Sequence, residues 1–201
     1  IGLRTDGTIH GWGFNDWGNT GVLLVNQTID YDPRSSPVQI SSQTNFTNVK
    51  AGEEFSYAIT SDGKIHSWGN PYVGHLGSGD CGSPTQIPGS WSDISVGDWH
   101  NLALRTDGTL WAWGSNKFGG LGNGNVIAAY SPIQIPGLWK WVSSSDEYSL
   151  AVRKNGTAWA WGYNGGGELG IGTRNHVSTP VQLPGLWTRI VAGYQHTLGI
   201  K

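Results

Sequence analysis

Acidic and aromatic side chains gather in the expected turns of this 201-residue chain, and they are the residues best suited to chemistry. Carboxylates attract cationic groups, and Trp, Tyr and Phe are enriched at the centres of protein–protein interfaces. The candidate binding residues are Trp17, Tyr72, Trp99, Phe118, Tyr194, Glu53, Glu54, Asp98, Asp146 and Glu147. They predict a surface that binds a protein partner, and a basic partner surface would complement it.

Motifs for enzymatic chemistry are missing from the sequence. It has no H-E-x-x-H, C-x-x-C, Walker or Rossmann glycine pattern, and Cys81 is its single cysteine. His100 and His196 share a repeat position that Phe55 and Tyr148 fill elsewhere, which is typical of packing. We therefore expect a non-enzymatic protein with no catalytic residue, no cofactor and no metal site.

A repeated Trp-Gly dipeptide indicates which elements position these residues. It follows a turn residue at the same spacing in four copies, at Trp12-Gly13, Trp68-Gly69, Trp113-Gly114 and Trp161-Gly162. Such intervals are typical of solenoid or propeller repeats. Because these tryptophans share one register, we expect them all to be core residues, and likewise Trp91, Trp139, Trp187 and Phe46.

Each repeat reads as four short antiparallel strands, called a to d in chain order. In the fullest copy, Asp107-Gly108 separates two alternating runs, which is a strong hairpin signal. A Ser-Pro pair opens the last strand, and proline favours a sheet edge. The expected strands are 94–96, 101–104, 109–113 and 131–135.

This pattern predicts an all-β fold, a β-propeller built of four-stranded antiparallel blades. The composition agrees, with 32 Gly, 9 Pro and 12 Trp supplying turns and core filler. We expect one propeller domain or propeller fragment over residues 1–201. Its repeats are predicted at about 1–48, 49–93, 94–141 and 142–188, with a partial copy at 189–201.

The repeat resembles that of the regulator of chromosome condensation family over the whole chain. The matching residues run A-G-x-x-H-T-L-A-L-x-x-D-G-T-x-W-x-W-G-x-N, followed by G-x-L-G-x-G and S-P-x-Q-[IV]-P. The resemblance implies a seven-bladed ring, and we expect a bacterial or phage member. The family includes a guanine-nucleotide exchange factor, a plant ultraviolet photoreceptor and a β-lactamase inhibitor, so the repeat implies fold rather than function.

Two of those roles find little support in the residues. The exchange factor's basic tail has no counterpart here, since the net charge is −2. The photoreceptor resemblance would require a G-W-R-H-[ST] motif in the a–b turns. The corresponding residues here are 97–101, 193–197, 52–56 and 145–149, and none carries that Trp-Arg pair.

The ends of the chain raise the question of blade number. Ile1-Gly2-Leu3-Arg4 aligns with Leu102-Ala103-Leu104-Arg105, so the chain starts within a strand b and stops at the same place in another copy. We expect it to be part of a longer ring of about seven blades. The alternative is that the four repeats close as they stand.

In an antiparallel blade, the a–b and c–d connections lie at one edge and the b–c hairpins at the other. The first edge carries the acidic and aromatic candidates, and the second carries Arg4, Lys64, Arg105, Arg153 and Lys154. The long connection at 22–34 is a further candidate, either a tolerated insertion or a functional loop.

The expected function is protein–protein interaction through the acidic-aromatic edge. The alternatives are a structural or decoration module of a bacterial surface or phage virion, which would assemble into a larger complex, and a carbohydrate-binding propeller. Low net charge argues against nucleic acid, and the absence of a long apolar run argues against membrane insertion. Polar Asn-, Ser- and Thr-rich loops favour an extracellular, cell-surface or virion location.

Overall fold

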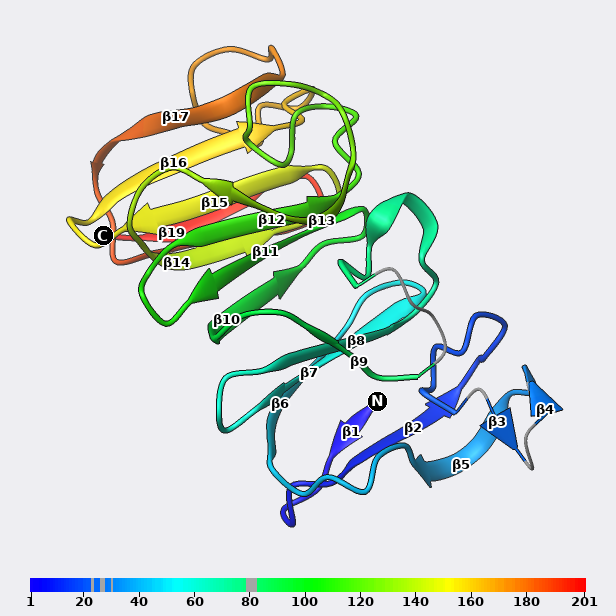
Figure 1. Cartoon of the computed structure of the whole chain (residues 1–201). Helices are drawn as coiled ribbons and strands as arrows, with labels where there is room; N and C mark the ends of the chain where they lie inside the picture. Colours follow the sequence, from blue (N-terminus) through cyan, green and yellow to red (C-terminus); the bar gives the residue numbers. More distant parts are fainter. Residues whose placement is uncertain (23, 26–27, 30, 79–82) are drawn as a thin grey trace. The chain divides into compact units, whose positions relative to one another are not determined.

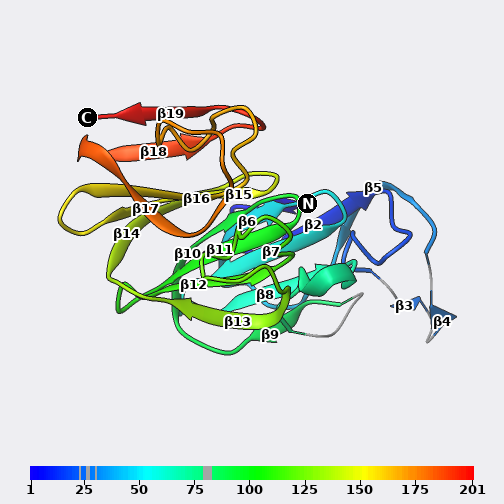
Figure 2. The same ribbon diagram turned by 90° about the horizontal axis from the view of Figure 1, so that it is seen from above.

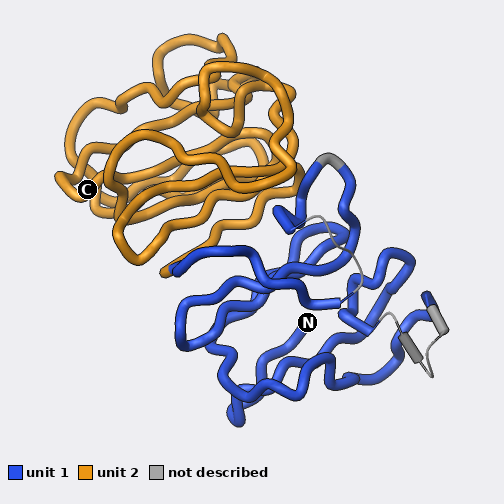
Figure 3. Tube along the Cα trace, in the orientation of Figure 1, with its two compact units in different colours: residues 1–91 blue, residues 92–201 orange. Residues whose placement is uncertain are grey.

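The computed structural model describes residues 1–22, 24–25, 28–29, 31–78 and 83–201. It divides the chain into two compact units, residues 1–91 and 92–201, which are described separately here (Figure 3). Residues 23, 26, 27 and 30 of the 22–34 connection lie outside the described residues, and so does Cys81. Within the described ranges, the only helix is the short 3-10 helix η1 (Tyr72–Gly74), and no helix is long and apolar enough to span a membrane.

The second unit contains the best-formed repeats (Figure 1). One four-stranded antiparallel sheet has the order β10-β11-β12-β13, and the next has the order β14-β15-β16-β17. The strands of the first are β10 (Trp91–Val96), β11 (His100–Arg105), β12 (Leu110–Gly114) and β13 (Ala129–Ile135). Those of the second are β14 (Trp139–Ser144), β15 (Tyr148–Arg153), β16 (Thr157–Gly162) and β17 (Val177–Leu186).

A two-stranded sheet follows, formed by β18 (Arg189–Ala192) and β19 (Thr197–Ile200). Strand β18 packs against β14 and β15 of the preceding sheet. Figure 2 shows the two strands side by side, with the C-terminus at the end of β19. They correspond to strands a and b of a further repeat.

The first unit holds one complete blade and one three-stranded sheet. The blade has strands β6 (Phe46–Ala51), β7 (Phe55–Thr60), β8 (Ile65–Gly69) and β9 (Thr85–Ile87). The sheet β1-β2-β5 consists of β1 (Gly2–Leu3), β2 (Ile9–Gly13) and β5 (Arg34–Gln39), and β3 (Leu24–Val25) pairs with β4 (Thr28–Ile29). The predicted a–b–c–d order of antiparallel strands is thus confirmed.

The b–c hairpins form as the Asp-Gly turns predict. Leu104 pairs with Leu110 at the base of one hairpin, and Gly108 at its tip has a φ of 87°, a conformation that glycine adopts without steric cost. The carboxylate of Asp107 accepts hydrogen bonds from the backbone N and the Oγ1 of Thr109, at 2.8 and 2.7 Å. These bonds lower the pKa of Asp107 and hold the turn closed.

Strand a is longer than the sequence pattern indicated. The expected run at 94–96 is the second half of a six-residue strand that begins at Trp91, and the equivalent strand of the second repeat begins at Phe46. The early start has a physical cause, because the strand's first residue is tied to the preceding hairpin. The backbone N of Trp139, for example, donates to the carbonyl of Gly108 at 2.8 Å.

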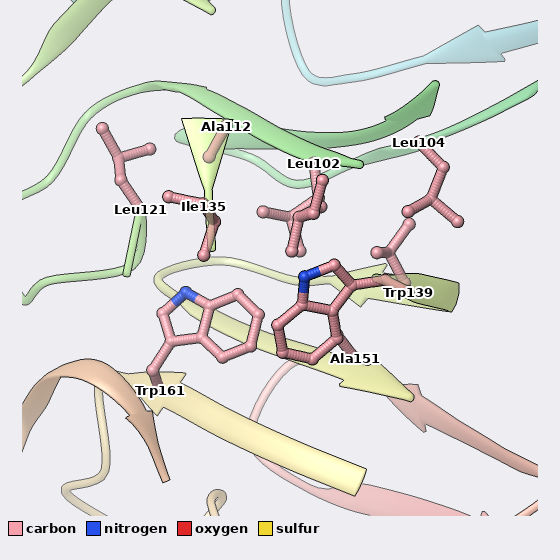
Figure 4. Packing of buried hydrophobic residues seen from close by; sticks show 10 residues of the cluster. Leu102, Leu104, Ala112, Leu121, Ile135, Trp139, Ala151 and Trp161 are labelled. Atoms are coloured by element: carbon pink, nitrogen blue, oxygen red, sulfur yellow. The ribbon is translucent and has the colours of Figure 1, made fainter. Parts of the chain in front are cut away.

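The core of the second unit lies between its first two sheets. Trp161 of β16 is fully buried there, and its indole Nε1 donates to the carbonyl of Gly120 at 2.8 Å (Figure 4). The cluster around it consists of Leu102, Leu104, Leu110, Ala112, Leu121, Ile135, Trp139, Val142 and Ala151. The third repeat therefore completes its core with a tryptophan from the fourth.

In the first unit, a strand-c tryptophan also fills a core that it shares with the preceding repeat. The prediction that all four Trp-Gly tryptophans are core residues is nevertheless wrong for Trp12. Trp68 is buried and donates from its Nε1 to the carbonyl of Asn19 at 3.1 Å. Trp12 occupies the equivalent strand position and is 46% exposed. Trp68 packs with Ile9 of the preceding repeat and with Phe46, whereas the ring of Trp12 lies partly in solvent beside Gly2.

Of the four residues expected to pack after the Pro-Gly turns or at the same repeat position, three are buried. These are Phe46, Trp91 and Trp139. Trp187 is only half-buried, since it lies beside the two-stranded sheet.

Candidate partner-binding face

The a–b turns and the c–d connections meet at one edge of each described blade, as the strand order predicts. Backbone hydrogen bonds join them directly. The amide that follows strand c donates to a carbonyl in the a–b turn, from Asn70 to Glu54, from Ser115 to Trp99 and from Tyr163 to Glu147, at 2.8 to 3.0 Å. These hydrogen bonds therefore hold together the backbone segments that carry the candidate side chains.

A buried asparagine in three repeats shapes the c–d connections that carry the candidates. In the fourth repeat, the Asn164 side chain accepts from the backbone N of Leu169 and donates to the carbonyls of Thr173 and Asn175, at 2.8 to 3.1 Å. Asn116 and Asn15 anchor their loops in the same way. Side-chain hydrogen bonds from these asparagines thus hold the c–d loops of three repeats in place.

In the second unit, two neighbouring a–b turns bring three carboxyl groups together, and we call Asp98, Asp146 and Glu147 the acidic cluster. Burial raises the pKa of Asp146, and the negative charge of Asp98 raises it further, while a hydrogen bond with the Trp99 side chain opposes the shift. Burial and the charge of Asp146 likewise raise the pKa of Glu147, and the Lys117 ammonium opposes that shift. All three carboxyl groups are half-buried, so the turns hold crowded negative charge partly out of water.

An aromatic group lies beside this cluster and consists of Phe118, Tyr163 and His176. The rings of Tyr163 and His176 stack with centroids 4.7 Å apart, and Phe118 meets both edge-on. Lys117 connects the two features, since its Nζ lies 5.0 Å from the Phe118 centroid while its charge acts on Glu147. The expected candidate Phe118 is therefore half-buried in a local cluster.

Sequence reasoning missed Tyr163 and His176 as members of the site. Tyr163 follows Trp161-Gly162 at a position where the third repeat has Ser115. An aromatic residue at a variable repeat position was the criterion that selected Phe118, and the same criterion would have found Tyr163. His176 gave no comparable signal, because its contact depends on the path of the c–d loop.

The remaining candidates occupy the same edge of their own repeats. Trp99 is exposed beside the acidic cluster, and Tyr194 is exposed in the last a–b turn. In the first unit, Trp17, Tyr72 and Glu53 are exposed, and Glu54 accepts a hydrogen bond from Asn70 Nδ2 at 2.5 Å. The structure thus groups Asp98, Trp99, Phe118, Asp146 and Glu147, whereas Trp17, Tyr72, Glu53 and Glu54 belong to the separately described first unit.

One serine and one histidine come together in the second unit, but they form a structural contact. His100 Nε2 lies 2.7 Å from Ser149 Oγ, and both side chains are fully buried. The serine hydroxyl donates to the carbonyl of Gly120 at 2.7 Å, so it accepts from the imidazole. Ser56 and Thr197 make the equivalent bond in other repeats, which identifies this serine as part of the repeat packing.

The opposite edge of the second unit carries cations that rest on tryptophan rings. Arg105 lies over Trp111 at 3.9 Å, and Arg153 lies over Trp159 at 4.2 Å. Arg105 and Arg153 thus lie beside the b–c hairpins, and the carboxylate of Asp107 lies at the same edge. Among the residues that the structure describes, no group of three or more His, Cys, Asp and Glu residues is placed to hold a metal ion.

Comparison with known proteins identifies the family to which the repeats belong. Models of the regulator of chromosome condensation (RCC1) repeat match residues 6–59, 107–152 and 155–200, and a second RCC1 repeat model matches 46–74 and 91–119. Protein pim1 of Schizosaccharomyces pombe is 30% identical over 96 residues, which cover 44% of this chain and 18% of pim1. The ultraviolet-B receptor UVR8 of Arabidopsis thaliana is 33% identical over 82 residues, 40% of this chain and 17% of the receptor.

The crystal structure of Prp20p from Saccharomyces cerevisiae, described with its binding properties to Gsp1p and histones, superimposes with a TM-score of 0.81 at 22% identity. The match covers 99% of this chain and 53% of Prp20p, so the chain spans about half the length of that protein. The repeat models cover most of the sequence and the fold agrees with them: the chain belongs to the regulator of chromosome condensation (RCC1) repeat family.

Proposed function

We propose that this protein is a non-enzymatic interaction module that binds a basic protein through the a–b and c–d edge of its blades. The observation that carries the proposal is the acidic cluster, whose half-buried carboxyl groups lie next to the exposed ring of Trp99. A lysine or arginine from a partner would relieve the repulsion between these carboxylates. The neighbouring rings would supply the apolar contact area typical of interface centres.

The relatives support a binding role in general terms. Prp20p has been studied for binding to Gsp1p and to histones, and histones are basic proteins. The first unit would contribute Trp17, Tyr72, Glu53 and Glu54 to the same function, and Tyr194 would extend the edge in the second unit. A bacterial or phage origin, with a role at a cell surface or virion, would be compatible with this function.

A direct test uses core histones as the probe and measures their affinity by biolayer interferometry. Trp99→Ala and the double variant D146N/E147Q are each expected to weaken binding at least about tenfold, because they remove a central aromatic contact and two desolvated charges. Asp107→Asn is the matched control, since it removes a carboxylate from the opposite edge and Asn155 already holds that turn in the fourth repeat. Equal affinities for all variants, or an equal loss in D107N, would contradict the proposal.

A further inference from the structure

The c–d connection of the third repeat carries two exposed apolar side chains, Val126 and Ile127, and we call them the apolar tip. The connection runs between the end of β12 and the start of β13 (Figure 1). Val126 is 60% exposed and Ile127 is 72% exposed. Apolar side chains that lie next to each other in solvent are typical of surfaces that bind a partner.

The conformation of the connection does not depend on these two side chains. The side chain of Asn116 donates to the carbonyls of Asn125 and Ile127 at 3.0 and 3.1 Å, and it accepts from the backbone N of Leu121 at 3.0 Å. The backbone N of Ile127 donates to Asn125 Oδ1 at 2.8 Å. Ile127 thus contributes its backbone N and O, which any residue except proline could supply.

The connection also has a separate apolar anchor. Leu121 is fully buried in the cluster around Trp161, as Figure 4 shows. Its counterpart in the fourth repeat, Leu169, is buried in the next cluster. The apolar tip is additional to this anchor, so packing of the connection on its own blade does not explain it.

The fourth repeat builds the same connection with polar residues at the tip. There, Asn164 makes the equivalent backbone hydrogen bonds, one of them to the carbonyl of Asn175 at 3.1 Å. Asn175 holds the position of Ile127, and Arg174 holds that of Val126. The two connections therefore share their hydrogen bonds but differ in the side chains that they present to solvent.

The apolar tip lies at the same edge of the blade as the acidic cluster. Ala129, which follows the tip, pairs with Gly114 at the end of strand c. The next amide, that of Ser115, donates to the carbonyl of Trp99 in the a–b turn at 2.8 Å. Trp99 follows Asp98, so the third repeat presents negative charge, an exposed indole and the apolar tip together.

A short path connects these features. Ser115 is hydrogen-bonded to Trp99, and the following residue, Asn116, is hydrogen-bonded to Ile127. Two hydrogen bonds and one peptide bond thus separate the a–b turn from the tip. A partner segment of about five extended residues, at about 3.3 Å each, is long enough to touch both.

We infer that this surface binds a partner segment in which a lysine or arginine lies about four residues from a bulky apolar residue. The cation faces the acidic cluster, and the apolar side chain covers the apolar tip. The inference rests on the proposed function, because the acidic cluster supplies the site for the cation. It adds an apolar requirement to that function and assigns the contact to the third repeat.

The test needs a variant that removes the apolar surface and keeps the fold, and V126T/I127N meets that need. Threonine has nearly the shape of valine, and asparagine is the residue that the fourth repeat has at the position of Ile127. The matched control is L138S at the opposite edge. Leu138 is 53% exposed, and Ser90 holds its position in the second repeat. Circular dichroism and thermal unfolding check that both variants fold.

The first measurement is selection of a phage-displayed library of random eight-residue segments on the immobilised 201-residue chain. We expect enrichment of segments that combine Lys or Arg with Leu, Ile or an aromatic residue. The V126T/I127N variant should still select basic segments but should lose the apolar preference. The L138S variant should select the same segments as the parent chain.

The second measurement is the affinity of the most enriched peptide, by fluorescence anisotropy. V126T/I127N should weaken binding about tenfold, whereas L138S should leave it unchanged. The loss in V126T/I127N should be the same at low and high salt, because apolar contacts are not screened. The loss in D146N/E147Q should shrink as salt is added.

Each other outcome is decisive. Enrichment of basic segments without an apolar preference would overturn the inference and leave the proposed function standing, as would an apolar preference that survives in V126T/I127N. A lack of basic enrichment would refute the proposed function, and the inference with it. Self-association in sedimentation velocity that V126T/I127N abolishes and D146N/E147Q does not would identify a second copy of the chain as the occupant, against the inference.

Discussion

Asp146 and Glu147 are carboxyl groups that the a–b turn holds partly out of water, with Asp98 nearby. A folded-state pKa above the unfolded value means that the native protein binds the proton more tightly than the unfolded chain does. Their contribution to stability is therefore fully present below the unfolded pKa, and it is lost as the pH rises through the folded pKa. At neutral pH, the charges of Asp146 and Glu147 therefore lower stability.

The raised pKa values predict how D146N and E147Q change the stability of the protein. Each variant should be more stable than the parent chain at pH 7, by less than about 1 kcal/mol because solvent screens half-exposed groups. The gain should shrink as the pH falls into the range where carboxyl groups protonate. Urea unfolding across the pH range measures it, and a loss of stability at pH 7 would show that the carboxylates are favourably paired.

The same two variants are expected to weaken partner binding, so stability and affinity should change in opposite directions. Groups that cost folding free energy are often retained for function. A variant that gains both stability and affinity would contradict a binding role for the cluster.

Sequence patterns predicted the environment of these residues well where the same residue type recurs in successive repeats. They did so less well where contacts with neighbouring segments determine burial. The pattern identified Asp98, Asp146 and Glu147 as turn residues, but only the fold brings two successive turns together. The prediction for Trp12 was wrong because burial depends on the preceding repeat, which a position within a repeat does not report. His176 was missed because its stacking on Tyr163 depends on the loop path.

At the scale of elements, the c–d connections rely on one asparagine each in three repeats. Asn164→Ala should destabilise the protein by about 2–4 kcal/mol, because it leaves the backbone groups of several loop residues without partners. Asn175→Ala, an exposed position in the same loop, is the control and should change stability by less than about 0.5 kcal/mol. Thermal and urea denaturation measure both, and equal effects would show that the loop does not depend on Asn164.

The tryptophans of strand c allow a sharper comparison, since the same residue type occupies one repeat position in two environments. Trp161→Ala should cost about 3–5 kcal/mol, because it opens a large cavity and removes the bond to Gly120. Trp12→Ala should cost less than about 1 kcal/mol, since its ring is already half in water. Similar losses for the two variants would mean that Trp12 is covered in the folded chain.

Strand order and hairpin positions followed from the sequence because Asp-Gly turns and alternating residues act locally. The length of strand a did not, since its first residues are recruited by a hydrogen bond to the preceding hairpin. A sequence pattern indicates the secondary structure that a segment prefers by itself. Contacts between repeats can then extend a strand beyond that segment.

At the scale of the whole molecule, the proposed binding mode predicts a dependence on salt, although the net charge of the chain is only −2. If the acidic edge receives a basic partner, added salt should slow association and weaken affinity, while dissociation changes less. Stopped-flow or interferometry measurements between low and physiological ionic strength would detect this. Salt-independent association would assign the binding to the aromatic group instead of the acidic cluster.

Within each unit, a tryptophan of one repeat fills the core of the repeat before it. This arrangement affects how such chains can change length during evolution. Within each unit, a core is assembled from two successive copies, so the natural unit of duplication or deletion is one full period, wherever the break falls. Removing such a period rejoins an indole with an equivalent site and leaves no empty core behind. A deletion of any other length would separate the two partners, so blade number can vary among descendants of one ancestor far more easily than blade structure.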